Sequence, residues 1–180
     1  MNRHIKLLLQ RALINILILL GAFTVQTCVF PLLPMFSAVP NLLLILTFSF
    51  GFIYGRKTGM LCGLAAGVLM DLFYTGPFGF YCLIFLYIGF FNGIFNKYYY
   101  NDFIQLPLIL CAVNELIYNF YIYVLRFLVR GKLDIGYYFM NIVLPEMVFS
   151  LIFTLFLYRV FLGANKRLDV IEDKRGTNVA

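Results

Sequence analysis

Residues 12–30 read ALINILILLGAFTVQTCVF, an apolar run that contains no charged residue. A helix of about 20 such residues is long enough to cross the hydrocarbon core of a membrane, where the backbone must satisfy its own hydrogen bonds. Arg11 precedes the run, and Pro31 and Pro34 follow it. This stretch therefore predicts a membrane-spanning helix near the start of the chain.

The composition of the whole chain has the same character. Hydrophobic residues make up 63% of the 180 residues and charged residues 12%, against about 45–50% and about 25% in soluble domains. A soluble domain of this size must present a large polar surface, which this composition does not supply. The composition excludes a soluble enzyme, a secreted disulfide scaffold and a disordered chain. It predicts an all-α membrane protein with no soluble domain.

Six apolar runs predict a bundle of six transmembrane helices. The runs lack the strict alternation that is typical of barrel strands. The predicted spans cover about residues 12–30, 40–55, 58–74, 78–95, 103–129 and 137–162. They form one transmembrane domain over residues 1–165, and residues 166–180 form a short charged cytoplasmic tail. The second and third spans are short, so they are either two true spans or a helical hairpin enclosed by the others. We favour two spans, because Arg56 and Lys57 lie between them.

The basic residues predict the orientation, because Lys and Arg are enriched at the cytoplasmic ends of membrane helices. With six spans and a cytoplasmic N-terminus, all 14 basic residues lie on the cytoplasmic side except Arg126, Arg130 and Lys132. We therefore expect a multi-pass membrane protein with both termini in the cytoplasm. The net charge of +6 then reflects topology and contact with anionic lipid headgroups rather than nucleic-acid binding.

Residues that carry enzymatic or metal chemistry are scarce. The four cysteines lie in apolar runs and form no Cys-x-x-Cys pair, and His4 is the only histidine. No Ser-His-Asp set, phosphate-binding loop or cluster of metal ligands can be assembled from this sequence. We expect no catalytic residue, no metal and no cofactor, and therefore a protein that is not an enzyme.

Glycine recurs at every fourth position in the third predicted span. The positions are Gly55, Gly59, Gly63 and Gly67, and Asp71 continues the spacing. Four residues advance about 400° around a helix, so these positions form one slowly turning stripe, which we call the glycine ladder. Small residues let membrane helices approach closely. The ladder is a candidate either for packing within the bundle or for docking a helix of another protein.

Two glutamates lie deep in predicted spans, where burying a charge is costly. Glu115 and Glu146 are both expected near the middle of the membrane, protonated and hydrogen-bonded. Asn114 and Asn119 are candidate partners of Glu115. Three interpretations remain open: a structural hydrogen-bonded network, contact with a partner's membrane helix, and a proton or substrate path.

A third acidic residue, Asp71, lies near the outer end of the third span. Arg126 lies near the outer end of the fifth span, at a similar depth. The two are candidates for an ion pair. The alternative is that each lies at the membrane interface with its charge among the headgroups.

Residues 40–95 carry several motifs in a fixed order. These are Pro40-Asn41-Leu42-Leu43-Leu44, Tyr54-Gly55-Arg56, the glycine ladder with Asp71-Leu72, and Gly76-Pro77-x-Gly79-x-Tyr81-x-Leu83. This order resembles the MreD family, rod shape-determining membrane proteins of bacteria. Asn41 departs from the Pro-Asp that is typical of the family. Length, six spans and basic ends agree with the family over the rest of the chain.

The resemblance implies a non-enzymatic membrane adaptor of the cell-wall elongation machinery, the elongasome, which regulates peptidoglycan synthesis and supports rod shape. The implied partners are an MreC-like single-span protein, the MreB filament and a RodA-type wall polymerase complex, bound directly or indirectly, and membrane lipids. No nucleic acid is implied. The helix-packing or partner-docking candidates that match the motifs are Gly55, Gly59, Gly63, Gly67, Asp71, Gly76, Pro77 and Gly79.

An alternative of a different class is the substrate-binding S component of an energy-coupling-factor vitamin transporter. Such components resemble this chain in length, in their six short spans and in a Gly-rich third helix that ends in Asp. The predicted architecture is therefore S-component-like. Polar residues are few in the predicted outer halves of the spans, which argues against a polar ligand.

Overall fold

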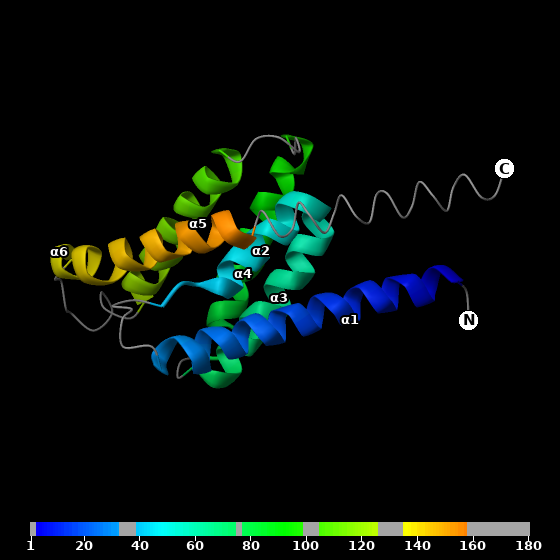
Figure 1. Ribbon diagram of the computed structural model, residues 1–180, viewed down its shortest axis with the longest axis horizontal. Helices are drawn as coiled ribbons and strands as arrows, with labels where there is room; N and C mark the ends of the chain where they lie inside the picture. The colour runs from blue at the N-terminus through cyan, green and yellow to red at the C-terminus, as the bar shows by residue number, and fades with distance from the viewer. Residues whose placement is uncertain (1–2, 33–38, 75–76, 99–104, 126–134, 158–180) are drawn as a thin grey trace.

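The computed structural model describes residues 3–32, 39–74, 77–98, 105–125 and 135–157. Every regular element in these residues is helical (Figure 1). Six helices follow one another, with short π-helical or 3₁₀ extensions: α1 (Arg3–Thr24, extended through Val25–Val29 and Phe30–Leu32), α2 (Leu42–Tyr54), α3 (Arg56–Phe73), α4 (Phe80–Ile94, extended through Phe95–Tyr98), α5 (Gln105–Tyr123) and α6 (Ile135–Tyr138). α6 continues through a π-helical turn (Phe139–Val143) to residue 157, and we call residues 135–157 the last helix.

Four of these helical stretches are long and apolar enough to cross a membrane. They are Leu13–Leu32, Phe80–Lys97, Gln105–Tyr123 and Gly136–Leu157. α2 has only 13 residues, about 20 Å at 1.5 Å per residue. α3 carries Arg56, Lys57 and Asp71, which lower its apolar character. The prediction of an all-α membrane protein with six helices is confirmed, and the membrane crossing of α2 and α3 stays a prediction.

α2 lies at the centre of the bundle. All of its residues from Leu42 to Phe52 are buried, and α1, α3, α4 and α5 all contact it (Figure 1). Its sequence is apolar all round, as expected of a helix that is enclosed by its neighbours. The surroundings of α2 are therefore other helices rather than lipid.

A single residue, Gly55, joins α2 to α3. Its φ of +88° and ψ of −179° fall in a region that is essentially restricted to glycine. The Asn96 side-chain amide donates hydrogen bonds to the carbonyls of Phe52 at 2.9 Å and Ile53 at 2.7 Å. Asn96 thus satisfies carbonyl groups that the end of α2 would otherwise leave unpaired. The tight α2–α3 hairpin depends on the backbone freedom of Gly55.

The glycine ladder of α3 faces α4. A methyl group built on Gly59 would overlap the carbonyl oxygen of Gly89, and one on Gly63 would overlap that of Phe85. A methyl group on Gly67 would meet the backbone of Cys82. Backbone therefore packs directly on backbone along most of α3, which is the geometry that small residues permit between membrane helices.

α2 joins this contact at one point. A methyl group on Gly51 would lie 2.6 Å from the carbonyl oxygen of Gly89, and one on Gly59 would lie 2.6 Å from the Cα of Gly51. Three glycines, one each from α2, α3 and α4, thus meet where three helices approach most closely. One turn further along α4, Gly93 packs against the backbone of Arg56.

The outer helices expose broad apolar faces. Only 22% of the residues are buried in the apolar part of α1, and only 17% in that of the last helix. Leu17 of α1 and Phe156 of the last helix are 66% and 68% exposed. Apolar surface of this extent needs lipid or another membrane helix to cover it. The exposed faces therefore agree with a membrane protein.

Candidate functional site

Asp71 caps the N-terminus of α4. Its carboxylate accepts hydrogen bonds from the backbone N–H groups of Gly79 at 3.0 Å, Tyr81 at 2.9 Å and Cys82 at 3.0 Å. The first N–H groups of a helix have no partner within the helix, and a negative charge there is favourable. Asp71 therefore fixes the end of α3 to the start of α4, in addition to the contact that the glycine ladder makes between the two helices.

The other motif residues near this cap lie in the connection between the two helices. Gly79 is the residue before α4 and has a φ of +97°, in the left-handed region that glycine adopts readily. The carbonyl of Pro77 accepts the N–H of Phe80 at 3.4 Å. Gly76 lies outside the described residues, and so does Arg126, the predicted ion-pair partner of Asp71.

A pair of asparagines joins α4 to α5. The side-chain amides of Asn92 and Asn114 donate to each other's oxygen at 2.9 Å, and each also donates to a carbonyl of its own helix, Ile88 or Leu110, at 2.7 Å. Both side chains are buried. In the described part of the chain, the amide of Asn114 therefore bonds Asn92 and not the adjacent Glu115, the partner expected from the sequence.

Glu115 is fully buried, with 0% of its surface exposed. The amide of Asn119 donates to Glu115 Oε2 at 3.4 Å. Glu115 Oε1 has no hydrogen-bond partner among the described residues. Glu146 of the last helix lies beside Glu115, close enough for their charges to interact, and Ser150 lies near both. The structure thus brings together the two glutamates that the sequence placed at a similar depth.

The N-terminus of α2 receives side chains from three elements. The amide oxygen of Asn41 accepts the N–H of Leu44 at 3.2 Å, and that of Gln26, from the end of α1, accepts the N–H of Leu43 at 3.1 Å. The N–H of Asn41 donates to the Ser150 hydroxyl at 3.1 Å. These bonds satisfy the N–H groups of a buried helix end. Asn41 is thus a capping residue, a role that a side-chain amide performs as well as a carboxylate.

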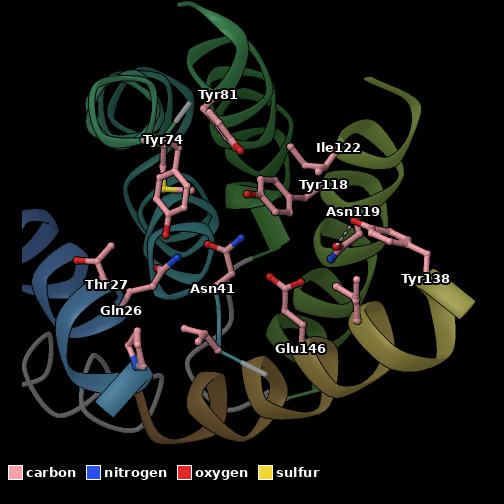
Figure 2. A pocket seen from close by; sticks show the side chains of 14 residues that line it. Gln26, Thr27, Asn41, Tyr74, Tyr81, Tyr118, Asn119, Ile122, Tyr138 and Glu146 are labelled. Atoms are coloured by element: carbon pink, nitrogen blue, oxygen red, sulfur yellow. Dashed lines mark hydrogen bonds between the residues drawn. The ribbon is translucent and has the colours of Figure 1, made fainter. Parts of the chain in front are cut away.

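A cavity of about 250 Å³ opens beside this end of α2 (Figure 2). Figure 2 shows the carboxyl group of Glu146 directed into it, toward Asn41, Tyr118 and Asn119. Side chains with hydrogen-bonding groups make up most of the lining: Gln26, Thr27, Asn41, Tyr74, Tyr81, Tyr118, Asn119, Tyr138 and Glu146.

Sequence analysis missed this cavity because its polar lining comes from separate helices, one or two residues from each. A capping signal was present in one place, since Asn41 directly precedes the apolar run of α2. The few polar residues of this end of the bundle therefore lie closer together than their number in the sequence suggests.

A second cavity, of about 620 Å³, lies at the opposite end of α2. Its lining includes Arg56 and Lys57 at the start of α3 and Lys97 just after α4. The guanidinium of Arg56 lies 5.9 Å from the centre of the Phe90 ring. One end of α2 is therefore basic, and the other end carries the carboxyl groups.

The family model described as rod shape-determining protein MreD matches residues 7–163. The chain belongs to the MreD family. The match extends from α1 to beyond the last helix, and it confirms the resemblance found within residues 40–95. No curated protein and no solved structure matches the chain. Membership of the MreD family assigns this membrane protein to rod-shape determination.

The arrangement in this MreD-family chain is one of packing and hydrogen bonding. The four cysteines are free thiols, and the hydroxyl of Thr154 donates to Cys111 Sγ at 3.1 Å. Across the described ranges, no three His, Cys, Asp or Glu side chains gather closely enough to hold a metal ion. The side chains most able to take part in chemistry are those of Glu115 and Glu146, of which Glu146 lines the polar cavity.

Proposed function

We propose that this member of the MreD family is a non-enzymatic membrane adaptor that supports rod shape by binding the membrane helix of a partner protein. Family membership supports the role in rod-shape determination. The large exposed apolar faces of α1 and the last helix support the binding of another helix. Both faces carry an open glycine, but small exposed side chains follow Gly21 on α1, whereas Phe139 and Met140 are exposed after Gly136 on the last helix.

The observation that carries the proposal is an open glycine on α1. A methyl group built on Gly21 would meet no atom within 4 Å. Thr24 and Cys28 are also exposed and follow at helical spacing, so small side chains continue beyond Gly21. The hydroxyl of Thr24 donates to the carbonyl of Leu20 at 2.8 Å, which leaves an apolar surface. A partner's helix can therefore approach the backbone of α1 closely at this face.

The glycine ladder is not available for the same purpose. α4 already occupies the space beside Gly59, Gly63 and Gly67, and an added methyl group there would overlap the α4 backbone. A docking role for these residues would require α4 to leave. We therefore place the partner on α1.

The proposed partner is an MreC-like single-span protein, and the MreB filament and a RodA-type wall polymerase complex are contacted directly or indirectly. We further propose that the chain crosses the cytoplasmic membrane several times with both termini in the cytoplasm. The basic residues around the second cavity support this orientation, since Arg56, Lys57 and Lys97 would all face the cytoplasm.

Gly21→Leu tests the docking face, and Gly136→Leu is its matched control. Both glycines leave open space for a side chain, so neither substitution should disturb folding. The variants are expressed in cells depleted of the wild-type chain. The amount of MreC-like protein that co-purifies in mild detergent is measured, together with cell shape.

Gly21→Leu is expected to lower partner recovery and to round the cells, while Gly136→Leu preserves both. Equal recovery with the two variants would overturn the α1 face. Cells that stay rod-shaped after depletion of the wild-type chain, with no variant expressed, would overturn the role in shape.

A second candidate function is that of the S component of a vitamin transporter. One observation favours it, namely the polar cavity at the N-terminus of α2. Co-purification of paired ATPases with a coupling subunit, or of a bound vitamin, would support this function in place of the adaptor.

A further inference from the structure

One buried carboxyl group lines the polar cavity and a second lies near it, and neither has a basic partner among the residues that the structure describes. Glu146 lines the cavity, and the fully buried Glu115 lies beside it. Neither carboxyl forms an ion pair with a described residue, and no basic side chain is among the described residues that line the cavity. Burying two acids together without a counter-charge is costly, so a bound cation would stabilise this arrangement.

Asn119 connects Glu115 to the cavity wall. Its amide donates to Glu115 Oε2 at 3.4 Å, and its oxygen accepts the hydroxyl of Tyr138 at 3.3 Å. Glu115 Oε1 remains without a hydrogen-bond partner in the described part of the chain, in a side chain that is fully buried. The Ser150 side chain lies near enough to this carboxyl group to interact with it, so it is Glu146 and the cavity wall that point to a ligand.

The wall of the cavity is suited to a group that donates hydrogen bonds. Carboxylate oxygens and tyrosine hydroxyls accept them, and Figure 2 shows those of Glu146 and Tyr118 directed toward the same space. An ammonium group has three donors and no acceptor. Tyrosine rings also attract cations. An anion would find no basic side chain among the described residues of the lining.

We propose that this cavity binds a primary ammonium group, carried either by a phospholipid headgroup or by a small free amine, with Glu146 as its main acceptor. The volume of about 250 Å³ falls just below the range of about 300–1,000 Å³ that holds drug-sized ligands. It therefore suits a headgroup or a small amine. The proposal is independent of the adaptor function, which is tested separately by the co-purification of the partner protein.

Binding is measured on the purified full-length chain in mild detergent. Thermal unfolding is followed in the presence of ethanolamine hydrochloride, ethylene glycol or sodium chloride at matched ionic strength. Native mass spectrometry then records retention of phosphatidylethanolamine and phosphatidylglycerol. The unfolding measurement detects binding of a free amine, and the mass spectrometry detects binding of a lipid headgroup that carries the same ammonium group.

The wild-type chain is expected to show a saturable rise in Tm with ethanolamine but not with ethylene glycol, or preferential retention of phosphatidylethanolamine over phosphatidylglycerol. Glu146→Gln keeps the size of the side chain and should weaken binding at least tenfold. Asn141→Ala is the matched control, because Asn141 lies on the same helix, is exposed and donates its amide to the carbonyl of Tyr137. Its binding should equal that of the wild type.

Three results would overturn the proposal: equal binding by Glu146→Gln, equal stabilisation by ethylene glycol, or no binding of either amine source by the wild type. Preferential retention of phosphatidylglycerol would overturn it as well. If Glu146→Gln does not fold, Tyr118→Phe takes its place. That variant removes a hydroxyl directed into the cavity and should weaken binding several-fold, and unchanged binding would again overturn the proposal.

Discussion

Replacing Gly63 by alanine is expected to destabilise the protein, whereas the same replacement at Gly21 is not. Gly63 lies against α4, where a new methyl group would overlap the carbonyl of Phe85 and lie 3.2 Å from the nitrogen of Leu86. At Gly21 the same methyl group would meet no atom within 4 Å. The two sites thus differ in surroundings while both lie in apolar helices.

The magnitude follows from two opposing contributions. Alanine is favoured over glycine inside a helix by about 1 kcal/mol, a gain that both variants share. Overpacking a core costs about 1–3 kcal/mol. At Gly63 the clashing atoms belong to the backbone of α4 and cannot rotate away as a side chain would, so the cost should lie near the top of this range. We expect Gly63→Ala to lose about 2 kcal/mol of unfolding free energy and Gly21→Ala to gain up to about 1 kcal/mol.

The unfolding free energy of each variant is measured in mild detergent by following helix content with circular dichroism as a denaturant is added. Gly63→Leu extends the series, and its larger side chain should prevent folding altogether. The reasoning is refuted if Gly63→Ala is as stable as the wild type, or if Gly21→Ala loses as much stability as Gly63→Ala. A monodisperse Gly63→Leu protein that still binds its partner would refute it too.

Substitutions at three further features probe the polar contacts and the backbone of the fold, each by the same unfolding measurement. Asp71→Ala leaves three N–H groups of α4 without their acceptor and should cost about 1–3 kcal/mol, with Asp71→Asn intermediate; unchanged stability of Asp71→Ala would contradict the cap. Gly55→Ala should cost about 1–3 kcal/mol because its backbone conformation excludes side chains, and a neutral result would mean that the hairpin has another geometry. Asn92→Leu and Asn114→Leu should each lower the stability of the protein more than the double variant does, because each single variant leaves one buried amide without its partner. A stability loss in the double variant equal to the sum of the two single losses would contradict the pairing.

The number and order of the helices could be predicted because apolar runs in a membrane protein correspond directly to helices. Their bounds were less predictable. The first span was expected from residue 12, yet α1 is helical from Arg3. An apolar run indicates only the part of a helix that lies in lipid, and the hydrogen bonds of the helix can continue beyond that part.

The neighbours of the helices could be predicted only in part. The ladder spacing predicted a close contact on one face of α3 but did not specify the helix on the other side. Gly89 and Gly93 of α4, which have the same spacing of four residues, were the available signal. The cap formed by Gln26, Asn41 and Ser150 left no such pattern, because its members come from elements far apart in the sequence.

The enclosure of α2 has a consequence for how the chain enters the membrane during synthesis. A 13-residue helix that carries Thr47 and Ser49 and is joined through Gly55 to a charged helix is a poor insertion signal by itself. Its close contact with α4 forms only after the ribosome has produced residues 80–94. We therefore expect α2 and α3 to remain bound to the insertion machinery until α4 has been synthesised, and the three helices to enter the bilayer together.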